Sequence, residues 1–279
     1  MNKWILVLSF IFPICVYAQT SGNCGPKDND GNFTSNCTYT YDTDTRTLTI
    51  SGTGKMADVG CTYDEQNHCI GNTPWKEYIS QINNIVVEEG ITSIGVHAFK
   101  WTSANNVSLP SSLENIGMAA FQYASALTNI TLPSHLEHIG HAAFNSTSIA
   151  YFTLPESFQK YENYENQNTY LFSNSHLRGI TIEGQADFVK DMLMGMDTSN
   201  VTIYCNKINP HCEELKNDAD IGDKIKFYEY KNGIYFYDGK IYDNPADIAV
   251  NKSAKRRIYT IEEANFVAGD KNRVSIKYR

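Results

Sequence analysis

The sequence lacks the features that mark several large classes of protein. Beyond residue 18 no segment approaches 18 consecutive apolar residues, so we expect no transmembrane segment in the mature chain. It also has no Gly-x-x-x-x-Gly-Lys phosphate loop, no Gly-x-Ser-x-Gly nucleophile elbow and no His-Glu-x-x-His zinc motif. We therefore expect no catalytic residue, cofactor or metal. A secreted enzyme whose Asp, Glu and His side chains converge only in space is the less favoured alternative.

Positive charge is also scarce. The chain has 23 Lys and Arg residues against 31 Asp and Glu residues, which gives a formal net charge of −8. Binding to nucleic acid or to anionic lipid depends on clustered basic side chains that neutralise phosphates. We therefore expect no nucleic-acid partner.

The first 18 residues have the pattern of a cleavable signal peptide. Lys3 supplies a positive charge, residues 4–16 are almost wholly apolar, and Ala18 ends a cleavage motif. The apolar run is too short to span a membrane and Pro13 interrupts it. Lipidation at Cys15 is disfavoured because no suitable small residue precedes it. The pattern predicts a protein that is secreted or at the cell surface.

Six cysteines remain after removal of the signal peptide. An even number in an exported chain favours disulfides. Sequence neighbours suggest three pairs, although other pairings stay open: Cys24 with Cys37, Cys61 with Cys69, and Cys205 with Cys212. A zinc site is the alternative, but no Cys-x-x-Cys pair is present, and His68 and His211 merely adjoin single cysteines.

The middle of the chain is repetitive. Phe99 and Phe121 are 22 residues apart, and Phe121 and Phe144 are 23 apart. Each of these phenylalanines follows an alanine and closes a unit with the same spacing of Ile, Leu and Gly residues. A fourth unit begins at Ile149 but lacks the Ile-Gly and Ala-Phe halves, and later strands begin near Leu177 and Val201. A fixed period of this length is typical of a solenoid, which we place at residues 82–204.

Each unit can be interpreted physically. Ile130-Thr131-Leu132 alternates apolar and polar residues, which predicts a short strand with one buried face. Leu136 and Ile139 keep helical spacing, Gly140 favours a turn, and Phe144 supplies a large apolar plug. One unit cannot bury these groups alone, so the units must stack into a parallel sheet with covered ends.

The repeat resembles a known family. Its pattern, Ile-x-x-Ile-x-Leu-Pro-x-x-Leu-x-x-Ile-Gly-x-x-Ala-Phe, is similar to the BspA-type leucine-rich repeats of microbial surface and secreted proteins. Residues 41–56 and Pro74-Trp75 also resemble the segment that leads into such arrays. The resemblance covers residues 38–155, with weaker support to residue 204. It implies an α/β leucine-rich-repeat solenoid with short parallel strands and few short helices. It also implies a surface role, commonly adhesion or recognition, without any catalytic residue.

The flanks predict caps. Residues 19–81 form an N-terminal β cap with a hairpin between residues 38 and 50, and residues 205–226 form a C-terminal cap segment. Residues 227–254 predict a β-meander, because Asn232-Gly233 and Asp238-Gly239 favour tight turns.

The last 25 residues, 255–279, predict a strand-helix-strand tail. Thr260 and Glu263 match a capping box, and Gly269 is suited to end the helix. The tail is basic, which suggests contact with an anionic envelope component or with export machinery or, more simply, a solvated strand edge protected by charge.

The repeat register predicts one polar strip on the outer face of the sheet. If Ile130 and Leu132 face inward, their neighbours face outward in every unit. The strip residues are Asn106, Ser108, Asn129, Thr131, Tyr151, Thr153, Thr181 and Thr202. A ladder of threonines also stabilises a sheet by itself, so the strip does not by its presence require a ligand.

Two further clusters are expected to carry no metal. His135, His138 and His141 are predicted to be solvent-facing loop residues that point in different directions. Residues 28–32 resemble part of a calcium loop without its later Glu, which favours a polar turn. The sequence as a whole predicts an exported binding or adhesion protein whose partner is an extracellular protein or glycan. A structural, envelope-associated protein is the alternative.

Overall fold

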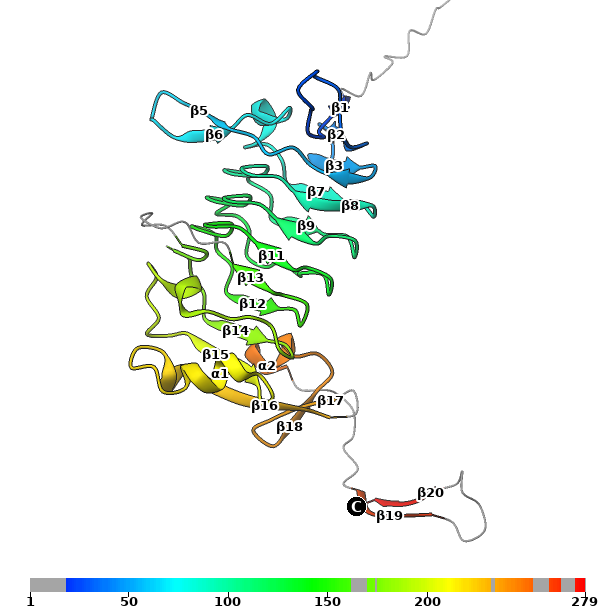
Figure 1. Cartoon of the computed structure of the whole chain (residues 1–279), viewed down its shortest axis with the longest axis vertical. Helices are drawn as coiled ribbons and strands as arrows, with labels where there is room; N and C mark the ends of the chain where they lie inside the picture. Colours follow the sequence, from blue (N-terminus) through cyan, green and yellow to red (C-terminus); the bar gives the residue numbers. More distant parts are fainter. Residues whose placement is uncertain are drawn as a thin grey trace, which may run out of the picture.

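Successive coils of the chain stack along one axis in the computed structural model (Figure 1). The structure describes residues 19–161, 170–173, 175–231, 234–252, 261–266 and 274–278. The predicted signal peptide lies outside these residues. Within residues 82–161, all of which are described, the coils consist of strands and turns and contain no helix.

A first line of strands runs along one side of the stack. It forms two sheets, in which β3, β7 and β9 are parallel to one another, as are β12, β14, β15 and β16. The strands are β3 (Thr47–Ser51), β7 (Asn84–Val87), β9 (Asn106–Ser108), β12 (Tyr151–Leu154), β14 (Gly179–Ile182), β15 (Thr202–Asn206) and β16 (Ile225–Lys231). Residues 129–132, described between β9 and β12, form no strand, so that prediction is wrong for this coil. Its backbone joins the next coil by other bonds, such as Ala150 N to Thr128 O at 3.4 Å.

A second parallel sheet is formed by the later half of each coil. Its strands are β4 (Gly54–Lys55), β8 (Ile91–Ile94), β10 (Asn115–Ile116), β11 (His138–Ile139) and β13 (Lys160–Tyr161). The register aligns Ile94, Ile116, Ile139 and Tyr161. The helical spacing expected at Leu136 and Ile139 is therefore wrong, because stacked β-branched side chains and ladder hydrogen bonds favour extended backbone here. The fourth unit keeps this half as β13, which the sequence pattern did not reveal.

The repeated glycines allow neighbouring coils to approach closely. A Cβ atom on Gly140 would lie 2.4 Å from Met118 N, and one on Gly117 would lie 2.7 Å from Val96 N. The left-handed backbone positions belong to other residues, such as Ala119 (φ 52°) and Ala142 (φ 55°). Gly140 is thus required for close approach rather than for the turn conformation we expected.

A column of aromatic rings fills the interior. Neighbouring ring centroids along it are separated by 5.9, 5.3, 5.6 and 6.2 Å. From the N-terminal end, the rings are those of Trp75, Phe99, Phe121, Phe144 and Phe172, all buried. Phe172 supplies the large apolar side chain that is missing from the sequence pattern of the fourth unit, displaced in sequence by the insertion at residues 161–170. Most of that insertion lies outside the described residues.

Antiparallel strands cover the N-terminal end of the stack. β1 (Gln19–Asn23) pairs with β2 (Thr38–Asp42), and β2 pairs with β3 in the expected hairpin. A second hairpin, β5 (Cys61–Tyr63) and β6 (Cys69–Gly71), precedes the 3₁₀ turn η1 (Lys76–Tyr78). Disulfides join Cys24 to Cys37 and Cys61 to Cys69.

The C-terminal end is covered by short helices and a meander. Between β14 and β16 lie the 3₁₀ turns η2 (Lys190–Leu193) and η3 (Gly222–Lys224) and the helix α1 (Pro210–Leu215). The third disulfide joins Cys205 to Cys212 on α1. β16 then pairs antiparallel with β17 (Ile234–Tyr237), which pairs with β18 (Lys240–Tyr242). The dipeptide 232–233 lies outside the described residues.

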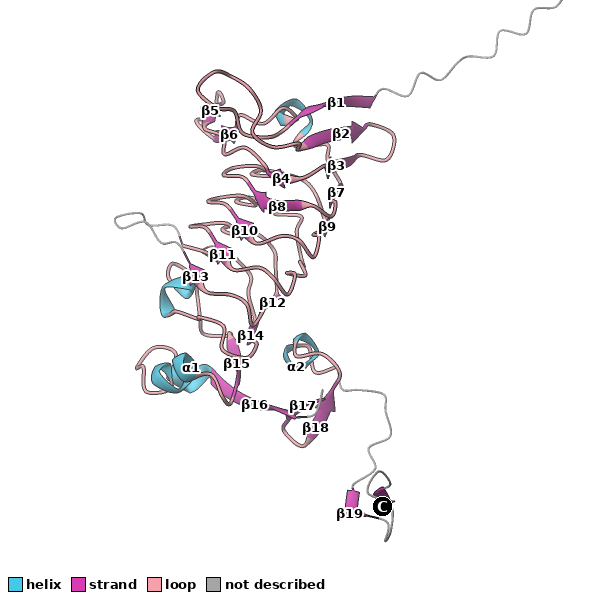
Figure 2. Ribbon diagram, turned by 45° about the vertical axis from the view of Figure 1, so that its right-hand side comes forward, coloured by secondary structure: helices cyan, strands magenta, loops and turns pink. Residues whose placement is uncertain are grey.

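A helix that the sequence analysis did not predict follows the meander. α2 (Ala246–Ala249) packs against β12, β14 and β15 (Figure 2). Asn244 Oδ1 accepts a hydrogen bond from Ala246 N at 2.9 Å, and Pro245 stands at the start of the helix. Both residue types favour helix initiation.

The tail differs from its prediction. Where a helix was expected after Thr260, β19 (Ile261–Phe266) pairs antiparallel with β20 (Val274–Tyr278). Strand pairing satisfies the backbone groups of both segments, whereas an isolated helix this short is marginal in water. Most of the basic tail residues lie outside the described part of the chain. In that described part, no helix is long and apolar enough to cross a membrane.

The aromatic column predicts a large loss of stability on truncation. Phe121→Ala should lower the free energy of unfolding by about 3–5 kcal/mol, because it leaves a cavity between two stacked rings. Urea denaturation followed by circular dichroism measures this change. Tyr63→Ala is the matched control, since Tyr63 is 67% exposed and its loss should change stability little. Equal effects of the two variants would contradict the role of the column.

Candidate functional site

The predicted strip follows the outer side of the first line of strands, and its members Asn129 and Thr131 lie in the segment between β9 and β12 that forms no strand. The residues that alternate with the strip members, such as Ile130 and Phe152, are buried. The strip members on either side of each buried residue therefore point outward. The exposed members are Asn106, Ser108, Asn129, Thr131 and Tyr151, and the half-buried members are Thr153 and Thr202. The side-chain amide of Asn106 donates to Asn84 Oδ1 across the sheet at 3.0 Å.

One member of the strip is not available to a ligand. Thr181 is 0% exposed, and its hydroxyl has no hydrogen-bond partner among the described residues. Helix α2 packs over this part of the sheet because Gly179 leaves room for it. A Cβ on Gly179 would lie 3.1 Å from the ring of Tyr151 and 3.3 Å from Ala249 Cβ. Thr181 was therefore wrongly predicted as an accessible binding residue.

A groove of about 350 Å³ lies between α2 and the strip. We call this space the strip groove. It brings together four strip residues, Asn129, Thr131, Tyr151 and Thr153. The opposite wall and the end of the groove include Glu183, Asn244, Asp247 and Val250. The repeat pattern does not reveal this second group, although the Asn-Pro pair before α2 is a usable signal for a helix.

The strip groove is acidic. Burial raises the pKa of the Glu183 carboxyl. A hydrogen bond with the Glu156 backbone opposes this in part, and the charge of the Glu156 carboxylate adds to it. The Asp247 carboxylate lies 3.9 Å from Lys252 Nζ, a weak contact near the surface. None of the described residues that line the groove is Lys, Arg or His. Its chemistry therefore suits neutral or cationic ligands better than anionic ones.

The other predicted clusters have different environments. His135 is exposed and His138 half-buried, but His141 is 1% exposed and its ring packs 6.2 Å from that of Tyr170. The solvent-facing prediction is wrong for His141, because Tyr170 of the next coil packs against its ring. Residues 28–32 form a polar turn in which Asp28 Oδ1 accepts from Asn32 N at 2.9 Å.

One described group has the spacing of metal ligands. The ligand atoms of Cys61, Cys69 and His97 all lie within 4.8 Å of one another. Both sulfur atoms are joined in a disulfide, as the grouping of the cysteines predicted. A thiolate is needed to ligate zinc, so the oxidised pair does not provide such a site.

A stack of short coils with parallel strands, aliphatic columns and an internal phenylalanine ladder defines a leucine-rich-repeat solenoid. Residues 69–198 match six copies of the BspA type leucine rich repeat region. This region of the chain is similar to that repeat family. No curated protein sequence matches the chain.

Solved structures of leucine-rich repeat proteins resemble this fold. One from Eubacterium ventriosum has a TM-score of 0.51 and 23% identity, over 78% of this chain and 48% of that chain. One from T. pallidum has a TM-score of 0.39 and 15% identity, over 67% and 94% of the two chains. One from Bacteroides ovatus has a TM-score of 0.36 and 18% identity, over 63% and 55%. The chain thus spans about half the length of the Eubacterium ventriosum protein, and this likeness shows the fold alone.

The half-buried Glu183 carboxyl in the groove predicts a pH-dependent effect on stability. Because the folded state raises the pKa of Glu183, folding favours the protonated form. This contribution is present below the ordinary pKa of 4.5 and is lost as the pH rises through the folded-state value. Glu183→Gln should therefore raise the melting temperature at about pH 7, with a smaller gain at about pH 4.

Thermal unfolding of both proteins at the two pH values measures this difference. Glu65→Gln removes a carboxyl from an exposed position and serves as the control. A gain at Glu183→Gln that is the same at both pH values would show that burial of the charge is not its cause.

Proposed function

We propose that this chain is an exported leucine-rich-repeat binding protein, acting at or outside the cell surface, that holds its ligand in the strip groove. The observation that carries this proposal is the convergence of the exposed strip and the α2 segment on one space of about 350 Å³. Concave sites with a few convergent polar groups are the usual places of ligand binding. Export is supported by the N-terminal pattern and by three disulfides, which persist in oxidising compartments.

The chemistry of the groove favours a neutral glycan over an extracellular protein as the ligand. Asn129, Thr131 and Asn244 provide amide and hydroxyl groups, which pair with sugar hydroxyls as both donors and acceptors. Tyr151 is 38% exposed and adds a flat apolar ring with a polar tip. The acidic walls oppose sulfated or uronic polymers, which carry negative charge.

Binding at one groove should be weak. Tight protein interfaces usually depend on several rigid aromatic or Arg anchors, and Tyr151 is the one aromatic anchor that the exposed strip residues provide. Adhesion through such a site depends on many copies of the protein on a surface meeting many copies of a repeating ligand. A glycan polymer satisfies that requirement directly.

Replacing a strip residue at the groove should abolish binding without unfolding the protein. Thr131→Arg places a bulky charged side chain in the groove from an exposed position, so retention on a neutral glycan array should fall at least about tenfold. Ser80→Arg adds the same side chain at an exposed position near the opposite end and is the matched control. Thermal unfolding of both variants verifies that they are folded.

The array should carry neutral and anionic glycans, and a parallel array should carry extracellular matrix proteins. If the chain binds only the matrix proteins, and Thr131→Arg abolishes that binding, the groove remains the proposed site but its ligand is a protein rather than a glycan. Binding that survives Thr131→Arg would move the site elsewhere. The mass of a bound oligosaccharide should be unchanged after incubation, whereas its cleavage would indicate an enzyme.

A further inference from the structure

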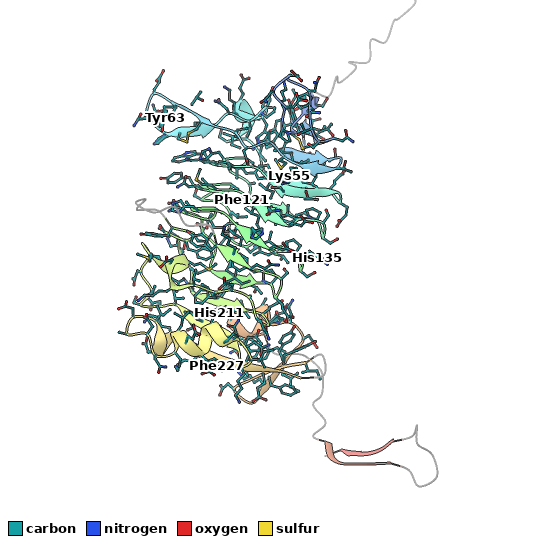
Figure 3. All side chains as sticks on the ribbon, viewed as in Figure 1. Lys55, Tyr63, Phe121, His135, His211 and Phe227 are labelled. Carbon is teal, nitrogen blue, oxygen red and sulfur yellow. A yellow bond between two sulfur atoms is a disulfide. The ribbon has the colours of Figure 1, made fainter. Side chains whose placement is uncertain are left out.

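The hairpin formed by β5 and β6 differs from the rest of the N-terminal cap in its exposure. It projects from the end of the stack, with Tyr63 labelled on it in Figure 3, whereas Phe121 lies inside the stack. Its disulfide is half-exposed at both Cys61 and Cys69. The four other paired cysteines are at most 5% exposed. The Cys61–Cys69 disulfide is therefore the accessible one of the three that the described residues form.

A buried lysine contacts this disulfide. Lys100 Nζ donates a hydrogen bond to Cys69 Sγ at 3.2 Å, and Lys100 is only 7% exposed. Burial lowers the pKa of the Lys100 ammonium, and no carboxylate among the described residues forms an ion pair with it. A desolvated cation without a counter-charge is costly. A thiolate at Cys69 would supply that counter-charge.

A histidine lies on the same side of the disulfide. The ring of His97 has a nitrogen within 4.8 Å of both sulfur atoms. His97 Nδ1 lies 3.0 Å from the Val59 carbonyl oxygen, which only accepts hydrogen bonds, so Nδ1 carries the proton. Burial lowers the pKa of the His97 imidazole, which favours the neutral ring at neutral pH. Its Nε2 is then unprotonated and can accept a proton from an incoming thiol.

We propose that the Cys61–Cys69 disulfide exchanges with a cysteine thiol of an extracellular peptide or protein and captures it as a mixed disulfide at Cys61. His97 Nε2 takes the proton of the incoming thiol, and the resulting thiolate attacks Cys61 Sγ. The bond from Cys61 Sγ to Cys69 Sγ breaks, and its electron pair leaves on Cys69 Sγ as a thiolate beside Lys100 Nζ. No oxidant or reductant is consumed, because one disulfide is exchanged for another.

The reverse reaction releases the captured molecule. The Cys69 thiolate, held in the hairpin, attacks Cys61 Sγ of the mixed disulfide, and the partner thiolate leaves and recovers a proton. Lys100 lowers the free energy of the leaving thiolate in the forward step, and a better leaving thiolate departs faster. Capture is therefore reversible, and its extent depends on the concentration of the thiol.

The test uses the mature chain with all three disulfides formed. The protein is incubated with reduced glutathione, with a cysteine-containing peptide, or with the same peptide carrying serine, then quenched with acid. Free thiols are alkylated, and non-reducing peptide mapping by mass spectrometry locates each adduct. We expect the adduct at Cys61, none with the serine peptide, and faster reaction with the peptide than with glutathione. Adducts spread evenly over the three disulfides would overturn the proposal.

Variants separate the role of Lys100 from simple exposure. Lys100→Met keeps the apolar stem and removes the charge, and should slow the formation of the adduct about tenfold. Lys76→Met removes an exposed lysine of the same cap and should not change the rate. An unchanged rate in Lys100→Met, with thermal unfolding showing a folded protein, would contradict the proposal.

A pH profile of the unmodified protein tests His97 without relying on the folding of any variant. The rate with the cysteine peptide should rise through the titration of a histidine, below the range in which the free thiol itself ionises. His97→Gln should shift this rise to the higher pH of the thiol. A wild-type profile that follows the ionisation of the thiol alone would exclude His97 as the base.

Discussion

The close approach of neighbouring coils is the constraint on which the rest of the structure depends. At Gly117 and Gly140 the backbone of one coil lies where a side chain of the next would begin. This distance lets the phenylalanine rings of successive units stack, with Phe99 and Phe121 separated by 5.3 Å between centroids. It also aligns the amide and carbonyl groups of adjacent coils into ladders on more than one side. A single larger residue at the glycine position would push neighbouring coils apart. It would disrupt the backbone contact, the ring stacking and the hydrogen-bond ladders together.

The same constraint explains which parts of the fold could be predicted. Inward positions such as Ile94 and Ile116 recur because each must match its neighbour in the next coil, so the period is written directly into the sequence. The sequence pattern does not determine the secondary structure between these inward positions in the same way. The spacing of Leu136 and Ile139 fits one turn of helix, yet the backbone is extended at Ile139, since ladder hydrogen bonds to two neighbouring coils stabilise it there. A local sequence pattern contains no information on hydrogen bonds that the segment forms with another coil.

The candidate site was only partly predictable for a related reason. The repeat register predicted Thr131 and Thr153 on the outer face, because both residues occupy the same position of the repeat. It could not show that α2, from about 70 residues further along the chain than Thr181, covers that residue. Long-range contacts of this kind lie outside the repeat and follow no period. The prediction for the tail was wrong for the same reason. The capping pattern at Thr260 favours a helix locally, but the segment after it pairs with β20.

The two proposed sites lie where a flanking segment meets the solenoid: the β5–β6 hairpin at one and α2, which packs on β12, β14 and β15, at the other (Figure 1). A repeating core tolerates little chemical variety, because each inward residue must fit two neighbours. Unusual groups therefore accumulate at the caps, where Lys100 meets the Cys61–Cys69 disulfide and α2 forms one wall of the strip groove. A groove that binds weakly and a disulfide that bonds reversibly complement each other on a surface. The first would set which glycan is contacted, and the second would prolong contact with a partner that carries both that glycan and a cysteine thiol.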